Sequence, residues 1–143
     1  MKALPLLFLL FCSSLAPRAF ANADALKLVP GGKIQVQTPF ETKVTTAAGT
    51  TIELGFADGE LEEASGAACE KGDVFEPGEK KLGLKAAVDA LKKLGKTLQG
   101  EWTYEQLENG EWVYDFEGTE NKKNVDFILS AESGKLLKTE VDE

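Results

Sequence analysis

The stretch that decides the fold is residues 101–118, EWTYEQLENGEWVYDFEG. Aromatic residues alternate with acidic or polar ones on both sides of Asn109-Gly110, which predicts a β-hairpin with one buried face. We expect Asn109-Gly110 to form a type I′ turn, because both residues tolerate positive φ. The buried face would carry five aromatic residues: Trp102, Tyr104, Trp112, Tyr114 and Phe116. Replacing Trp112 by alanine should then lower the free energy of unfolding by roughly 3–5 kcal/mol.

An amphipathic helix is predicted before this hairpin, over Leu84–Leu94, because apolar residues recur at helical spacing and lysines fall on the other side. Its buried stripe would contain Leu84, Val88 and Leu91. Gly95 is placed to be the left-handed C-terminal cap. After the hairpin, alternating apolar residues predict two more strands, over Asn124–Ser130 and Lys135–Val141.

The half of the chain that precedes the helix has the pattern of short strands. The predicted strands are Lys33–Thr38, Thr42–Ala47, Thr50–Ala57 and Glu60–Ala64. Asp58-Gly59 indicates a two-residue hairpin turn. The glycines, Pro77-Gly78 and many charges of Ser65–Lys81 indicate a connection, which we expect to pack Val74-Phe75 onto the core. The predicted class is therefore α+β, with N-terminal β-hairpins followed by a helix packed on an antiparallel β-meander.

The first residues, Met1–Ala21, have the layout of a secretory signal peptide: a basic start, an apolar run and a small-x-small cleavage site. We expect cleavage after Ala21, or alternatively after Ala23, and hence export to the periplasm or the extracellular space. An uncleaved membrane anchor is the alternative. The predicted organisation has three parts: the signal peptide at 1–21, a β-rich segment with a connecting loop at 22–81, and the helix with a four-stranded antiparallel sheet at 82–143.

Charge excludes several classes of partner. The chain has a net charge of −8; its leader carries two positive charges, Lys2 and Arg18, and no acid, so the mature chain would carry −10. Such a surface repels nucleic acid and anionic membranes. It is either simply well solvated or suited to a cationic partner. The chain has no histidine, which excludes His-dependent triads and makes a zinc site improbable.

Neither the cysteines nor the carboxylates indicate a catalytic site. Only Cys69 remains after cleavage, so no internal disulfide can form. Cys69 is either a small buried hydrophobe or a reactive thiol, and we favour the buried hydrophobe. Paired carboxylates need a desolvated cleft for acid/base work, and no such pair is indicated. We therefore expect no catalytic residue, no cofactor and no dedicated metal site.

Several carboxylates lie on the solvent-exposed face of the predicted hairpin. The candidate binding residues are Glu105, Glu111, Asp115 and Glu117, and Glu101 and Asp126 would extend this face. Carboxylates on neighbouring strands could collect Ca²⁺, which takes six to eight oxygen ligands, or they could form a solvated face that cross-strand lysines neutralise.

The C-terminal half resembles a known family in its order of elements and in its closing pattern. The helix is followed by Glu111-Trp112-Val113-Tyr114-Asp115-Phe116-Glu117, then by Val125-Asp126-Phe127-Ile128-Leu129, then by Ala131-Glu132-Ser133-Gly134-Lys135-Leu136-Leu137. This arrangement is similar to a PepSY domain over roughly residues 82–141. Ser130 stands where the family usually has Asp, and its hydroxyl can still support a turn.

The resemblance implies an exported, non-catalytic module. PepSY domains occur in propeptides of secreted metallopeptidases, which they are thought to restrain, and as stand-alone envelope proteins. The first functional hypothesis is therefore a PepSY-like binding module that restrains a secreted or periplasmic peptidase or binds another exported protein. The alternative is an envelope accessory protein that binds cations or a cationic ligand through its acidic surface. An enzyme is not expected.

Overall fold

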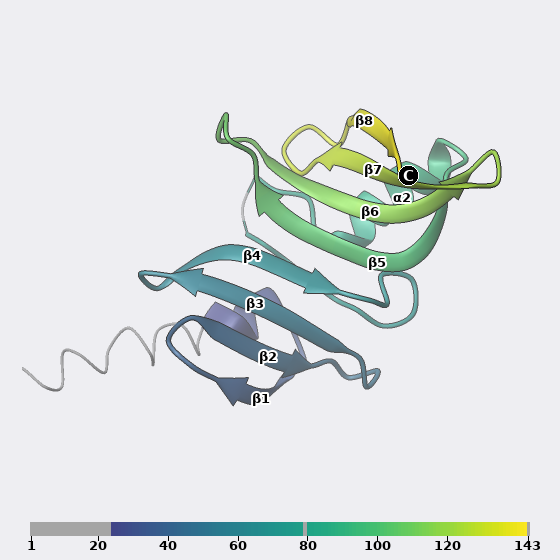
Figure 1. The fold of residues 1–143 in the computed structure, drawn as a ribbon. Helices are drawn as coiled ribbons and strands as arrows, with labels where there is room; N and C mark the ends of the chain where they lie inside the picture. Colours follow the sequence, from purple (N-terminus) through teal and green to yellow (C-terminus); the bar gives the residue numbers. More distant parts are fainter. Residues whose placement is uncertain (1–23, 79, 143) are drawn as a thin grey trace, which may run out of the picture.

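The computed structural model of the protein describes residues 24–78 and 80–142. Within them, eight strands form one antiparallel sheet whose order follows the chain (Figure 1). The strands are β1 (Lys33–Gln37), β2 (Glu41–Thr45), β3 (Thr51–Ala57), β4 (Glu60–Gly66), β5 (Thr97–Gln106), β6 (Trp112–Glu120), β7 (Lys123–Ser130) and β8 (Leu136–Val141). Helical structure is limited to α2 (Leu84–Lys93) and a short helix at residues 24–28. The predicted signal peptide, Met1–Ala21, lies outside the described residues.

The predicted α+β class is wrong, because the protein is mainly one antiparallel sheet. The N-terminal hairpins do not stand apart from a helix packed on a meander: β4 pairs with β5, with Ala64 opposite Tyr104 and Gly66 opposite Trp102. This pairing joins both halves of the chain into one hydrogen-bonded ladder. The division into segments at 22–81 and 82–143 stays a prediction, since a shared sheet does not show whether either segment folds alone.

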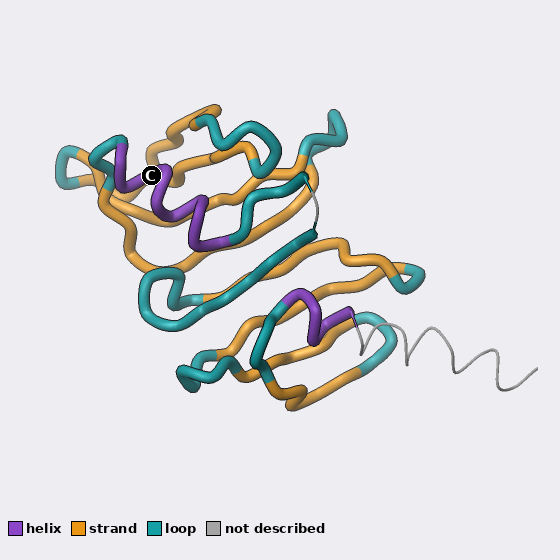
Figure 2. The backbone as a smooth tube through the Cα atoms, turned by 180° about the vertical axis from the view of Figure 1, so that it is seen from behind, coloured by secondary structure: helices purple, strands orange, loops and turns teal. Residues whose placement is uncertain are grey.

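One face of the sheet is covered by three separate pieces of chain. The short helix at residues 24–28, the connection between β4 and α2, and α2 itself all lie on the same side (Figure 2). Backbone hydrogen bonds tie these pieces together, from Glu76 N–H to the Leu28 carbonyl (2.7 Å) and from Leu84 N–H to the Phe75 carbonyl (2.9 Å). Among the described residues, no helix is long and apolar enough to cross a membrane.

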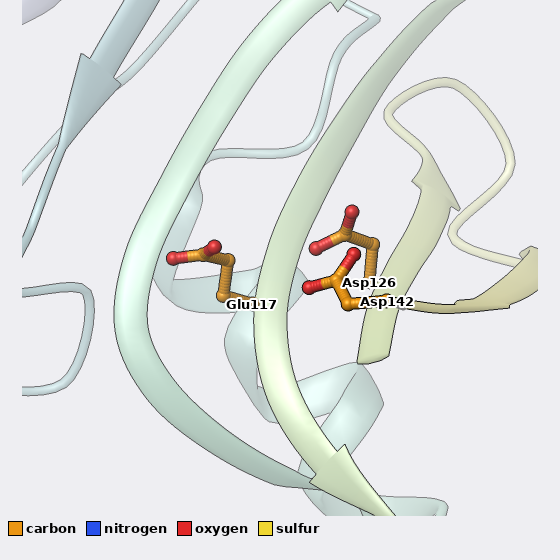
Figure 3. A group of neighbouring side chains, drawn as sticks. All are labelled: Glu117, Asp126 and Asp142. Atoms are coloured by element: carbon orange, nitrogen blue, oxygen red, sulfur yellow. The ribbon is translucent and has the colours of Figure 1, made fainter. Parts of the chain in front are cut away.

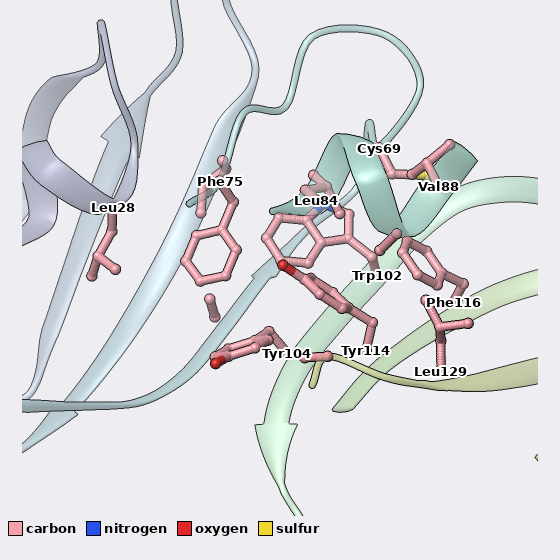
Figure 4. Packing of buried hydrophobic residues seen from close by; sticks show 14 of the residues in the cluster. Leu28, Cys69, Phe75, Leu84, Val88, Trp102, Tyr104, Tyr114, Phe116 and Leu129 are labelled. Atoms are coloured by element: carbon pink, nitrogen blue, oxygen red, sulfur yellow. The ribbon is translucent and has the colours of Figure 1, made fainter. Parts of the chain in front are cut away.

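The core lies between this cover and the sheet (Figure 4). It contains the aromatic face predicted from residues 101–118: Trp102, Tyr104, Tyr114 and Phe116 are buried, and Trp112 is half-buried and stacked on Tyr104. Phe75 of the connection is fully buried, with its ring centroid 5.1 Å from that of Tyr104. Its neighbour Val74 is 43% exposed, so only Phe75 packs as predicted for the pair.

The hairpin turns follow local sequence signals, with one correction. Asp58 and Gly59 both have positive φ (53° and 81°), as a two-residue turn of the primed type requires. The type I′ turn predicted at Asn109-Gly110 is wrong: of the two, only Gly110 has positive φ (94°), and its N–H donates to the Leu107 carbonyl at 2.9 Å. This is a three-residue connection with glycine in the left-handed position.

Helix α2 forms where its apolar spacing predicts. Leu84, Ala87, Val88 and Leu91 are buried. The helix ends as expected at Gly95 (φ 78°), whose N–H donates to the Lys92 carbonyl at 2.9 Å, because glycine adopts this left-handed conformation without a steric penalty. The start lacks a side-chain cap, since Gly83 is the N-cap residue.

A buried carboxylate fastens the connection to the sheet. Asp73 is 8% exposed and accepts three hydrogen bonds: from Trp102 Nε1 (2.7 Å), from the Thr50 hydroxyl (2.5 Å) and from Ala68 N–H (3.0 Å). These donors come from β5, from the residue directly before β3 and from the connection itself. Asp73 therefore holds together three pieces of chain that are remote in sequence.

Candidate functional site

The uncovered face of the sheet carries the predicted binding residues. Glu105 lies in β5, Asp115 and Glu117 in β6, and Glu111 directly before β6. Because side chains alternate between the two faces of a strand, Glu105, Asp115 and Glu117 project away from the buried Tyr104, Tyr114 and Phe116. We call these four residues together with Glu101 and Asp126 the acidic face.

Cross-strand register brings most of the acidic face close together. Asp115 pairs with Thr103 of β5, and Glu117 pairs with Asp126 of β7. Glu105 pairs with Val113, one row along the sheet from Asp115. The side chains of Glu105, Asp115 and Glu117 are only half-exposed, since the neighbouring strands crowd them.

Glu111 has a different task from the other three residues. Its carboxylate accepts a hydrogen bond from the Ser130 hydroxyl at 2.7 Å. That hydroxyl in turn accepts the backbone N–H groups of Glu132 (3.2 Å) and Ser133 (3.0 Å). Ser130 therefore does support the turn between β7 and β8, as the sequence predicts, and Glu111 orients it.

Sequence reasoning left Asp142 out of the candidate residues. Carboxylate oxygens of Glu117, Asp126 and Asp142 all lie within 4.8 Å of one another (Figure 3). Asp142 reaches this place because its N–H donates to the Asn124 carbonyl of β7 at 2.9 Å. The acidic tail 140–143 was visible in the sequence, but the register of β8 that places it beside β7 was not. With one oxygen each, these carboxylates would supply three of the six to eight oxygens that Ca²⁺ takes, and with both oxygens each they would supply six.

Burial and mutual repulsion raise the pKa values of two of these carboxyl groups. The pKa of Asp115 rises from 3.8 to about 6, first because of burial and then because Asp126, Glu105, Glu140 and Asp142 are negative. The pKa of Asp126 also rises, through burial and the charges of Asp142 and Glu140. Crowded carboxylates that repel one another favour a positively charged neighbour.

Lysines do not neutralise the centre of the acidic face. Within residues 24–78 and 80–142, the ion pairs formed on the uncovered face join Lys43 to Glu53 (3.8 Å) and Lys138 to Glu140 (3.1 Å). In the same ranges no lysine nitrogen lies within 4.0 Å of the Asp115, Glu117 or Asp126 carboxylates. The cross-strand neutralisation considered from the sequence therefore does not occur at these three residues.

Two open hollows lie along this face. The first has a volume of about 470 Å³, and its lining includes Glu53, Glu101, Thr103, Asp115, Glu117 and Asp126. The second has a volume of about 540 Å³, and its lining includes Glu60, Glu62, Glu63, Glu105 and Trp112. Each is wide enough to accept side chains from another molecule, and the lining of each is rich in carboxylates.

The titration of Asp115 gives a testable consequence for stability. The pKa of Asp115 is higher in the folded chain than in the unfolded chain, so the folded state binds more protons between about pH 4 and pH 6. The free energy of unfolding therefore falls as pH rises through that window. Asp115→Asn removes this pH-dependent loss of stability, because asparagine does not titrate. After allowance for solvent screening of a half-exposed group, we expect it to raise the free energy of unfolding by about 1 kcal/mol at about pH 7.5.

The measurement is urea denaturation of both proteins at about pH 7.5 and at about pH 4. At the lower pH the two proteins should have the same stability. Glu108→Gln, at an exposed residue away from this face, is the control and should change stability little at either pH. A gain in Asp115→Asn that is equal at both pH values would contradict the raised pKa.

The single cysteine of the described chain is not a reactive group. Cys69 is 7% exposed, and its pKa rises to about 11, first through burial and then through the charges of Glu70 and Asp73. The thiol is therefore protonated at neutral pH, and a thiol is a much weaker nucleophile than a thiolate. This confirms the prediction of a small buried hydrophobe.

Comparison with known proteins places the C-terminal half in a family. Residues 81–140 match the family described as "Peptidase propeptide and YPEB domain", PepSY. Comparisons with curated proteins and with solved structures gave no match. PepSY domains are propeptide-like or inhibitor-like modules that typically contact peptidases or other proteins. The matched residues include α2, β5, β6, β7 and most of β8, and hence the centre of the acidic face, so the chain is a PepSY domain-containing protein.

Proposed function

We propose that the protein is an exported, non-catalytic binding module that restrains a secreted or periplasmic peptidase, with the acidic face as the contact surface. The observation that supports this most is the group of half-buried carboxylates without lysine partners on the uncovered side of the PepSY sheet. The aromatic residues of the same strands are buried in the core. The uncovered side therefore offers a partner mainly charge and hydrogen-bond acceptors.

The chemistry of this face favours a partner with lysine or arginine side chains. A guanidinium group can bind a carboxylate through two parallel hydrogen bonds, and the first hollow brings Asp115, Glu117 and Asp126 to one place. Bringing a cation there also relieves the repulsion that, after burial, raises the pKa of Asp115. Such charge complementarity speeds association and makes its rate depend on salt.

The test is the rate of association with peptidases recovered from the exported fraction, measured at low and at high salt. The variant Glu105→Gln/Asp115→Asn/Glu117→Gln should associate at least about tenfold more slowly at low salt, because electrostatic steering is lost. Glu111 is left unchanged, because it holds the Ser130 turn. The control variant Glu41→Gln/Asp89→Asn/Glu108→Gln removes the same number of charges from exposed positions and should keep most of the rate.

Equal rates for the two triple variants would show that net charge alone, and not the acidic face, steers binding. If no exported protein binds at micromolar concentration, the restraint of a peptidase should be abandoned. The second candidate function, cation binding by an envelope accessory protein, then takes its place, and the spacing of Glu117, Asp126 and Asp142 favours it. Saturable Ca²⁺ binding that Asp126→Asn abolishes would support that candidate.

Export itself is part of the proposal and has its own test. We expect the protein recovered outside the cytoplasm to begin at Asn22, or alternatively at Asp24, because the leader Met1–Ala21 ends in a small-x-small motif. Intact-mass measurement of secreted or periplasmic material decides this. A mature protein that still begins at Met1 would contradict it.

A further inference from the structure

The outer edge of β8 has no partner strand among the described residues (Figure 1). Asp142 N–H donates inward, to the Asn124 carbonyl of β7. Successive residues of an antiparallel strand direct their backbone groups to opposite sides, so Thr139 and Val141 direct theirs outward. Such a row of unpaired N–H and carbonyl groups is a template for another strand.

We propose that β8 pairs in antiparallel fashion with β8 of a second copy of this chain, with Thr139 on the two-fold axis. In this register Lys138 lies opposite Glu140 of the second copy, and Leu137 lies opposite Val141 of the second copy. Because the two copies are related by a two-fold axis, each of these residue pairs occurs twice in the dimer. Thr139 faces Thr139 of the second copy, and both direct their backbone groups into the shared edge.

The charges of Lys138 and Glu140 favour this register over the registers whose two-fold axis lies one residue away. A two-fold axis at residue 138 would place Lys138 opposite itself, and an axis at residue 140 would place Glu140 opposite itself. Like charges directly opposite each other destabilise a strand pair, and opposite charges stabilise it. An edge lysine normally discourages strand addition, but with the axis at Thr139 each Lys138 meets a carboxylate.

The exposed apolar residues of β8 fit the same register. Leu137 is 45% exposed and Val141 is 53% exposed, although both are large and apolar. Pairing with a second copy brings each of them opposite the other and removes part of both from water, which is favourable. The self-complementary order of Leu137, Lys138, Glu140 and Val141 is the reason for choosing a second copy, and not an unrelated strand, as the occupant.

The opposite edge of the sheet lacks the self-complementary charges of β8. Strand β1, Lys33–Gln37, contains one lysine and no acid, so self-pairing there would leave Lys33 without an opposing carboxylate. Each edge strand has one register shift, β1 between Ile34 and Val36 and β8 between Leu136 and Lys138, so the charge pattern is what distinguishes the two edges. We therefore expect association through β8 alone. The net negative charge of both copies opposes association, so the dimer should be weak.

The test is sedimentation velocity of the mature chain across a range of concentrations up to about 1 mM. Wild-type protein should form a dimer. Lys138→Glu or Glu140→Lys alone places like charges opposite each other and should weaken the dimer at least about tenfold. The double variant Lys138→Glu/Glu140→Lys restores both pairs and should recover the wild-type affinity. An equimolar mixture of the two single variants should form a heterodimer by the same rule.

Thr139→Pro is an independent variant, because proline removes an N–H that points away from β7 and so leaves the β7 ladder intact. It should abolish the dimer while circular dichroism stays that of a folded sheet. Val36→Lys on β1 is the matched control and should dimerise as the wild type does. Three results would each overturn the proposal: a wild-type chain that is monomeric throughout, a dimer that none of the β8 variants weakens, or a monomer whose β8 binds a strand of another protein.

Discussion

Trp102→Ala should lower the free energy of unfolding by about 3–5 kcal/mol, the usual range for emptying a large aromatic site. Trp102 is 2% exposed and packs against both Phe75 and Tyr114, with ring centroids 5.4 and 6.3 Å away. Truncation leaves a cavity and also removes a hydrogen bond to the buried Asp73 carboxylate. Both effects act in the same direction.

Urea denaturation of the mature chain measures this loss, with Trp112→Ala as the control. Trp112 is half-exposed and stacks on Tyr104 at 4.8 Å, so we now expect a loss of about 1–2 kcal/mol there, less than the 3–5 kcal/mol expected from the sequence. If Trp102→Ala does not fold, Trp102→Phe, which keeps a ring and loses the N–H, serves instead. Equal losses at the two tryptophans would contradict the described packing.

Asp73→Ala should lower the free energy of unfolding by about 3 kcal/mol, because one buried donor and two partly buried donors lose their acceptor at once. These donors are Trp102 Nε1, the Thr50 hydroxyl and Ala68 N–H. Since Asp73 ties the connection to β3 and β5, its loss should also expose residues 67–78 to proteolysis before the sheet unfolds.

Limited proteolysis and urea denaturation together test this prediction. Asp73→Asn keeps the shape and one acceptor oxygen, so it should lose less stability than Asp73→Ala. Glu108→Gln, at an exposed position, should lose almost none. If Asp73→Ala were as stable as Glu108→Gln and cleaved no faster, the carboxylate would not fasten the connection.

Local pattern was enough to find the strands but not to pair them. Alternation within residues 101–118 and the turn residues Asp58-Gly59 predict hairpins, since each hairpin is formed by neighbours in the sequence. The β4–β5 pair joins Gly66 to Trp102 across a connection and a helix, and no short-range signal specifies that contact. For this reason the sequence predicts N-terminal hairpins followed by a helix packed on a meander, in an α+β class, whereas the chain forms one continuous sheet.

The candidate site residues that could be predicted are those whose placement depends only on local sequence pattern. Glu105, Asp115 and Glu117 could be assigned to one face because they alternate with buried aromatic residues in a single hairpin. Asp142 could not, because its position depends on how β8 registers against β7.

The most direct test of the acidic face as a binding face is a titration of exported peptidase activity with the mature chain. Wild-type protein should suppress the activity of its target near equimolar ratio. The variant Glu105→Gln/Asp115→Asn/Glu117→Gln should need at least about tenfold more protein for the same suppression, and the control variant Glu41→Gln/Asp89→Asn/Glu108→Gln should act as the wild type does. Equal suppression by all three proteins would contradict a role for the acidic face, and unchanged activity at saturating wild-type protein would contradict restraint of that peptidase.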